Sequence, residues 1–156
     1  MKKRIIALGL LWCLSAVMLQ AARVDTVLVR SAAMNKDVKV VYVLPDKAIG
    51  KQACPVVYLL HGYGGNARSW VQLKPELPQM AEEKGIIFVC PDGKNSWYWD
   101  SPENPAYRYE TFVTSELVKY TDGNYATIPD SKARAISGLS MGGHGALWSA
   151  IRHKDV

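Results

Sequence analysis

A glycine–serine–glycine motif constrains the fold of this chain more than any other feature of its sequence. Residues 138–142 are Gly-Leu-Ser-Met-Gly, which fits G-x-S-x-G, a pattern that places the serine at the tip of a sharp turn between a strand and a helix. The backbone approaches itself closely there, so the residues two before and two after the serine must be small. Gly138 and Gly142 meet this requirement, and we predict that the turn presents Ser140 as a nucleophile. A helix-capping serine in an ordinary glycine-rich turn is the alternative.

The flanking sequence supplies the strand and the helix that this turn needs. Residues 133–137 predict a short strand, and apolar residues recur at helical spacing after the turn. The N–H of Met141 would then lie at a helix N-terminus, where a free donor and the helix dipole can stabilise an oxyanion. The apolar positions of this helix are Ala146, Leu147, Ala150 and Ile151.

Apolar patterning predicts the remaining elements. Two runs rich in β-branched residues flank a turn at residues 35–37 and predict an antiparallel hairpin at a sheet edge. Two continuous apolar runs predict strands that are covered on both faces. The predicted strands cover residues 24–31, 38–44, 55–60 and 85–93, with a polar loop at 45–52. The predicted helices cover residues 69–84, irregular at Pro75 and Pro78, and 109–120, with Glu110 and Glu116 off its apolar face.

A glycine-rich loop, residues 61–66, follows the strand at 55–60. Such a loop at the carboxyl end of a parallel strand is where an α/β enzyme binds its ligand. Its glycines let backbone N–H groups approach a bound oxygen, and we predict that the N–H of Tyr63 is an oxyanion donor facing that of Met141. His61 is expected to be structural, since it directly follows the predicted strand at residues 55–60.

The loop at residues 94–106 contains three consecutive aromatic residues, Trp97, Tyr98 and Trp99. On a loop above the rim of a site, these rings could stack on an aromatic or sugar group of a substrate. They could equally pack the loop onto the domain. The sequence leaves both interpretations open.

The first 22 residues have the pattern of a secretory signal peptide. Three basic residues at positions 2–4 precede an apolar run over residues 5–19, and small residues follow at positions 21 and 22. The run is short for a membrane span, which needs about 20 apolar residues, although an uncleaved anchor is the alternative. We expect cleavage, export as a secreted or periplasmic protein without membrane contact, and a single domain over residues 23–156.

Composition narrows the class of protein. The formal net charge is +5, of which the leader contributes three positive charges, so the mature chain carries only +2 and lacks the basic footprint of a nucleic-acid-binding protein. No spacing of Cys and His suggests a zinc site.

Cys54 precedes one predicted strand and Cys90 ends the next, so in parallel neighbours their sulfurs would be too far apart to bridge. We predict two buried thiols, with a disulfide as the alternative.

Four segments in order resemble one family. They are Leu-Leu-His-Gly-Tyr-Gly-Gly-Asn at 59–66, Pro-Asp-Gly-Lys-Asn-Ser-Trp-Tyr-Trp-Asp at 91–100, Tyr-Glu-Thr-Phe-Val-Thr-Ser-Glu-Leu at 109–117 and Ile-Ser-Gly-Leu-Ser-Met-Gly-Gly-His-Gly-Ala at 136–146. Together they resemble the esterase D-like group of α/β-hydrolases, which includes S-formylglutathione hydrolases, tributyrin esterases, feruloyl and acetylxylan esterases, and mycolyltransferases. The resemblance covers most of residues 38–156. It implies an α/β-hydrolase fold with three layers and a mostly parallel central sheet.

The resemblance also implies a serine carboxylic ester hydrolase that works through an acyl-enzyme. Ser140 would be the nucleophile and the N–H groups of Tyr63 and Met141 the oxyanion hole, with no metal and no organic cofactor. For an exported member we expect acetyl, feruloyl or short-chain acyl esters, including acylated polysaccharide, because the glutathione thioester hydrolases work in the cytoplasm. A non-catalytic binding protein and an acyltransferase are the alternatives, and the sequence leaves the oligomeric state open.

One departure from the family pattern is large. In α/β-hydrolases the acid and the His base follow the nucleophile in the chain, but only sixteen residues follow Ser140. His61 precedes it, His144 lies one turn along the predicted helix, and His153 is expected at a surface helix end. We therefore expect the N-terminal part of a longer enzyme of about 250 residues, truncated after the nucleophile helix and inactive by itself. A short chain that has lost catalysis is the alternative.

Overall fold

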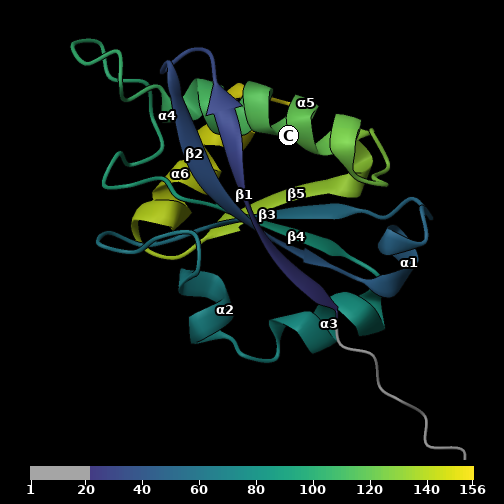
Figure 1. The fold of residues 1–156 in the computed structure, drawn as a ribbon. Helices are drawn as coiled ribbons and strands as arrows, with labels where there is room; N and C mark the ends of the chain where they lie inside the picture. Colours follow the sequence, from purple (N-terminus) through teal and green to yellow (C-terminus); the bar gives the residue numbers. More distant parts are fainter. Residues whose placement is uncertain (1–21) are drawn as a thin grey trace, which may run out of the picture.

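The computed structural model describes residues 22–156 and shows a five-stranded sheet with helices on both faces (Figure 1). The strands lie in the order β1-β2-β4-β3-β5. The expected signal peptide lies outside the described residues, except for Ala22. None of the helices described between residues 22 and 156 is long and apolar enough to cross a membrane.

The first two strands form the predicted antiparallel hairpin at one sheet edge. β1 (Arg23–Ser31) pairs with β2 (Lys36–Leu44) from Arg23 opposite Leu44 to Ser31 opposite Lys36. The connecting turn ends at Asn35, whose φ of 50° is one that asparagine tolerates better than most residues.

The other three strands are parallel to one another and carry the candidate site. β3 (Val56–Leu60) lies between β4 (Ile87–Pro91) and β5 (Arg134–Gly138) and is parallel to both, whereas β2 pairs with β4 in the antiparallel sense. The carboxyl ends of these three strands therefore meet at one edge of the sheet, and their following loops lie together there.

Side-chain alternation along the strands divides the core into two layers. Val40 and Tyr42 of β2 point to one face, where the helical segment after residue 108 and α6 (Met141–Arg152) lie. Val41 and Val43 point to the other face, which is covered by α2 (Ser69–Leu73) and α3 (Leu77–Lys84). The three-layer α/β arrangement predicted from the sequence is confirmed (Figure 1).

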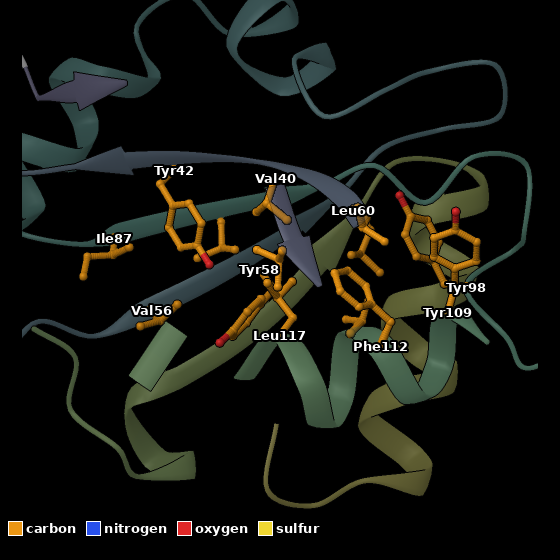
Figure 2. Packing of buried hydrophobic residues seen from close by; sticks show 14 of the residues in the cluster. Val40, Tyr42, Val56, Tyr58, Leu60, Ile87, Tyr98, Tyr109, Phe112 and Leu117 are labelled. Atoms are coloured by element: carbon orange, nitrogen blue, oxygen red, sulfur yellow. The ribbon is translucent and has the colours of Figure 1, made fainter. Parts of the chain in front are cut away.

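The larger layer is rich in aromatic residues. Figure 2 shows Tyr42, Tyr58, Phe112 and Leu117 between the sheet and the helical segment after residue 108, and all four are essentially inaccessible to solvent. Burying a large apolar side chain stabilises a fold by roughly 1.5–3 kcal/mol, so this layer is the main anchor of the helices to the sheet.

The helices differ in detail from the prediction. The helix expected at 69–84 is two helices, α2 (Ser69–Leu73) and α3 (Leu77–Lys84), because Pro75 has no N–H to continue the first. Gly85 ends α3 in the left-handed conformation at φ 63°. The loop expected at 45–52 contains a short helix, α1 (Asp46–Ile49).

The helix expected at 109–120 runs on to residue 124. It consists of α4 (Tyr109–Thr111), a π-helical turn (Phe112–Glu116) and α5 (Leu117–Asn124). A short 3-10 turn (Ser131–Ala133) then leads into β5.

The two cysteines within residues 22–156 lie in different layers of the core. Cys54 packs on the face that carries α6, and Cys90 packs on the face that carries α2 and α3. Both are buried and free, which confirms the predicted thiols and excludes the disulfide. Burial raises the pKa of the Cys90 thiol to about 12.

Candidate active site

The serine of the glycine–serine–glycine motif lies between β5 and α6 in a strained conformation. Ser140 has φ 53° and ψ −116°, a region that costs a non-glycine residue about 1–3 kcal/mol. Hydrogen bonds hold the turn on both sides of it, from the N–H of Gly142 to the carbonyl of Leu139 at 2.8 Å and from the N–H of His144 to that of Ser140 at 3.1 Å. The predicted sharp turn is present.

Both glycines of the motif are required by close backbone approach. A Cβ at Gly138 would lie 2.2 Å from the backbone of Gly142. A Cβ at Gly142 would lie 2.2 Å from the carbonyl oxygen of Leu60, so the start of α6 packs on the end of β3 as well as on the turn.

The glycine loop (residues 61–66) lies directly against this turn. The N–H of Leu139 donates to the carbonyl of Leu60 at 3.2 Å. A Cβ built at Gly62 would lie 3.6 Å from the Cβ of Ser140. The structure thus brings the two motifs that were separated by more than seventy residues into van der Waals contact.

Two backbone donors near Ser140 are unused. Within residues 22–156, neither the N–H of Tyr63 nor that of Met141 donates a hydrogen bond to a protein acceptor. Met141 begins the 12-residue α6, whose dipole favours negative charge at this end. Free, oriented N–H groups beside a serine hydroxyl are the arrangement that stabilises a tetrahedral oxyanion.

A pocket of about 410 Å³ lies between the glycine loop, α2 and Leu139, the residue before Ser140. Leu139 and Leu73 give it apolar walls, and Ser69 and Gln72 of α2 give it polar ones. Its full lining is Gly62, Tyr63, Gly65, Ser69, Gln72, Leu73 and Leu139.

His61 is buried and fully hydrogen-bonded, so it is not free to act as a base. Its Nδ1 lies 2.7 Å from the carbonyl oxygen of Gly62, and its Nε2 lies 2.9 Å from the N–H of Gly93. A carbonyl can only accept and an N–H can only donate, so the ring is neutral with its proton on Nδ1. This agrees with the structural role predicted for it.

Asp92 lies beside the ring of His61, with 3.7 Å between its Oδ1 and Nε2. Burial opposes the charged carboxylate, but the ammonium group and the backbone N–H of Lys94, at 2.8 and 3.0 Å, more than offset this and hold the pKa of Asp92 well below its usual range. The buried carboxylate therefore remains ionised next to the glycine loop.

His153 and Glu110 differ from their predicted environments. His153 is half-buried rather than on the surface, and its Nε2 lies 2.8 Å from Oε1 of Glu110. Glu110 is buried rather than off the apolar face, and it also accepts from Trp148 and Arg152 at 2.7 and 2.8 Å. No spacing rule finds this cluster, because its donors lie about forty residues from Glu110 in the sequence.

This His–carboxylate pair is remote from Ser140. Ser140 and His153 flank the two ends of α6 and are thirteen positions apart, about 20 Å at the helical rise of about 1.5 Å per residue. His144 is nearer, but its ring is exposed, stacks on Trp148 and places Nδ1 2.9 Å from the carbonyl of Trp97.

The three aromatic residues of the long loop separate into two groups. Trp97 and Trp99 are 46% and 47% exposed, whereas Tyr98 is fully buried. The suggestion that Tyr98 stacks on substrate is therefore wrong, because its ring packs against Gly145 of α6 and its hydroxyl bonds the backbone of His61. Trp97 and Trp99 remain available.

Among the residues that the structure describes, no three His, Cys, Asp or Glu side chains are grouped so that they could hold a metal ion.

The chain matches the family model "Putative esterase" over residues 31–156. It is 29% identical over 132 residues to the acetyl esterase of Caldicellulosiruptor saccharolyticus, and the aligned region covers 79% of this chain and 48% of that protein. It is 32% identical over 142 residues to the diacylglycerol acyltransferase/mycolyltransferase Ag85A of Mycobacterium gordonae, and the aligned region covers 85% of this chain and 40% of that protein.

The fold is likewise shared with a solved ferulic acid esterase. The two structures superpose with a TM-score of 0.73 at 30% sequence identity, over 87% of this chain and 57% of that chain. The chain therefore spans about half the length, or less, of the curated relatives that it matches.

Proposed function

We propose, on the premise that this chain belongs to the esterase family of α/β-hydrolases, that it contributes the nucleophile and the oxyanion hole of a serine carboxylic ester hydrolase. Family and fold agree with the resemblance drawn from the sequence. The catalytic roles of individual residues are our proposal.

One observation supports this proposal above the others. Ser140 is held in a strained conformation against the glycine loop, next to two backbone donors that have no protein acceptor. Strain and unused donors both cost stability, and such costs are concentrated at sites of chemistry. A binding module would have no need of them.

The reaction that we propose uses this geometry. The hydroxyl of Ser140 attacks the ester carbonyl, and the negative charge that develops on the carbonyl oxygen rests on the N–H groups of Tyr63 and Met141. Collapse of the tetrahedral intermediate expels the alcohol and leaves an acyl-enzyme, which water hydrolyses to free Ser140 and a carboxylic acid.

The attack also requires a general base, and the described histidines do not supply it. His61 has both ring nitrogens engaged, and His153 is bound to Glu110 at the other end of α6. His144 is held by Trp97 and Trp148, with its Nδ1 on the Trp97 carbonyl. We therefore propose that the 156-residue chain alone has only the residual rate that an oxyanion hole and binding provide, about 10³–10⁴ over water.

We propose acetyl, feruloyl or other short acyl esters as substrates, carried by small alcohols or by polysaccharide. The names of two relatives, an acetyl esterase and a ferulic acid esterase, support these acyl groups. The exposed rings of Trp97 and Trp99 suit a sugar or aromatic group. The leader-like residues 1–22 support export, and with it a substrate outside the cytoplasm.

Acyl transfer is the second candidate. It is favoured by the 32% identity to a protein named as a diacylglycerol acyltransferase/mycolyltransferase. The two reactions share the acyl-enzyme and differ only in whether water or an alcohol accepts the acyl group.

The test uses the protein purified from its native source together with its Ser140→Ala variant. We expect hydrolysis of 4-nitrophenyl acetate, methyl ferulate or acetylated xylan that the variant lacks, and product analysis with added glycerol separates hydrolysis from transfer. Activity that survives in Ser140→Ala would contradict the proposal.

A further inference from the structure

We propose that residues 93–98, which we call the bridging loop, set the direction of the Tyr63 N–H relative to Ser140, and that Asn95 and Tyr98 are its positioning residues. This inference rests on the proposed function, in which the Tyr63 N–H is an oxyanion donor. It gives the long loop a part in the reaction besides contact with substrate.

The peptide between Gly62 and Tyr63 determines where the donor points. Its carbonyl oxygen, that of Gly62, accepts from the N–H of Gly65 at 3.0 Å and lies 2.7 Å from Nδ1 of His61. A trans peptide is planar, with its N–H directed opposite to its carbonyl. Fixing the Gly62 carbonyl therefore fixes the Tyr63 N–H.

The bridging loop holds the residues on both sides of that peptide. Before it, the hydroxyl oxygen of Tyr98 accepts from the N–H of His61 at 3.0 Å, and the N–H of Gly93 donates to Nε2 of His61 at 2.9 Å. After it, the side-chain oxygen of Asn95 accepts from the N–H of Gly64 at 2.8 Å.

The same loop is also docked on the helix that follows Ser140. The ring of Tyr98 packs so closely on α6 that a Cβ at Gly145 would lie 2.5 Å from it. Nδ1 of His144 donates to the carbonyl of Trp97 at 2.9 Å, and the two rings meet edge to face. The bridging loop therefore contacts both α6, which follows Ser140, and the glycine loop.

Tyr98 is well suited to this task. It closes the larger core layer at the end of β3, beyond Leu60 (Figure 2). Burial raises the pKa of its hydroxyl well above the usual range, so the group stays neutral and both accepts from and donates to the backbone of His61.

The loop itself is strained in a way that only its contacts explain. Lys94, Trp97 and Tyr98 have φ values of 50°, 56° and 58°, a region that costs an ordinary residue about 1–2 kcal/mol. Three such residues within five positions would relax if the loop merely connected β4 to the next helix. The bonds to His61 and Gly64 hold it in place.

The experiment measures kcat and KM for 4-nitrophenyl acetate with the native protein and four variants. Asn95→Ala removes the acceptor of the Gly64 N–H, and Asn95→Asp restores an oxygen acceptor. Tyr98→Phe keeps the ring and removes the hydroxyl. Asn104→Ala is the matched control, because Asn104 is an exposed asparagine that accepts the N–H of Ala106 away from the glycine loop.

Outright loss of an oxyanion donor costs about 10²–10³ in kcat, and a misdirected donor should cost part of this. We expect kcat to fall about tenfold in Asn95→Ala and in Tyr98→Phe, with KM changed less than twofold. Asn95→Asp should recover most of the rate, and Asn104→Ala should match the unchanged protein. A fall in Tm with unchanged kcat in both Asn95→Ala and Tyr98→Phe would overturn the proposal.

Amide hydrogen exchange provides a readout that does not depend on activity. We expect faster exchange at Gly64 in Asn95→Ala and at His61 in Tyr98→Phe, with α6 unaffected. Unchanged exchange at both would also overturn the proposal. If the native protein shows no Ser140-dependent esterase activity, the proposed function fails, while the exchange data still decide whether the bridging loop holds the glycine loop.

Discussion

The two ends of α6 contain similar groups arranged for opposite purposes. At the N-terminal end, Ser140 is strained and the N–H of Met141 has no acceptor among the described residues. At the C-terminal end, Glu110 accepts from Trp148, Arg152 and His153. The N-terminal end leaves its donors free for a ligand, whereas the donors of the C-terminal end bind Glu110 and fix the helix in place.

This difference shows how a reaction site can be told from a structural one. A histidine hydrogen-bonded to a buried carboxylate is also part of a catalytic triad, so His153 and Glu110 could be mistaken for one. Their bonds, however, are shared with Arg152 and Trp148, and the pair lies about 20 Å from Ser140 by helical rise. Position and unused bonding capacity distinguish the site, while residue type does not.

The largest effect is expected from Gly142→Ala at the N-terminal end. Its Cβ would lie 2.2 Å from the backbone of Leu60, and backbone cannot move aside as a flexible side chain can. We expect a loss of at least about 4 kcal/mol in the free energy of unfolding, measured by urea denaturation.

Gly143→Ala is the matched control for that change. Its Cβ would meet only the Gly138 carbonyl, at 3.4 Å, so its cost should stay below about 1 kcal/mol. Equal destabilisation by the two substitutions would show that the close approach to β3 is not what fixes the turn.

At the C-terminal end, Glu110→Gln should destabilise the protein by about 2–3 kcal/mol. The amide cannot satisfy Arg152 and His153 as the carboxylate does, and breaking one partner of a buried ion pair is costly. The exposed Glu103, changed to Gln, is the control and should be neutral. Chemistry at Ser140 should persist in Glu110→Gln below its Tm; a large fall in kcat with the fold intact would mean that the two ends are coupled.

Glu110 at the C-terminal end should contribute to the pH dependence of stability, in addition to Asp92 beside the glycine loop. Burial opposes ionisation of Glu110, but its bonds from Trp148, Arg152 and His153 prevail and lower its pKa from 4.5 to about 2. The folded state therefore binds this proton more weakly than the unfolded state. The resulting stability is present above pH 4.5 and is lost as the pH falls toward 2, about 1–2 kcal/mol after allowance for solvent screening.

Thermal unfolding of the native protein and of Glu110→Gln between pH 6 and 2 tests this. The difference in Tm between the two should narrow as the pH falls. A constant difference over the whole range would rule out Glu110 as the titrating group.

The smallest effect, with the opposite sign, is expected from Gly123→Ala in α5. A Cβ there meets nothing within 4 Å, so the change should stabilise the protein by about 0.5–1 kcal/mol through helix propensity alone. Urea denaturation of this variant gives the baseline against which the cost of Gly142→Ala is read. Destabilisation would mean that α5 has a neighbour at this position.

The sequence predicted the N-terminal end of α6 far better than the C-terminal end. Gly138, Ser140 and Gly142 are constrained by local backbone geometry, which a five-residue pattern records directly. Glu110 is held by donors brought to it by the fold, and a helical-wheel argument sees only its own helix. The π-helical turn at residues 112–116 further shifts the faces of that helix from the ideal period.

Tyr98 shows a second limit of prediction from sequence. Three consecutive aromatic residues carry no periodicity that separates an inward ring from an outward one. Only the close approach of Gly93 and Gly145 to its ring shows why the middle residue is buried. Both glycines can be read from the sequence, but their contact with the ring of Tyr98 cannot.

Covalent labelling tests the central claim most directly. The protein from its native source would be treated with a fluorophosphonate, and the adduct located by intact mass and peptide mapping, with Ser140→Ala as the control. We predict one adduct, on Ser140, which the variant lacks. An adduct on a different serine, or esterase activity in the absence of labelling at Ser140, would contradict the assignment of Ser140 as the nucleophile.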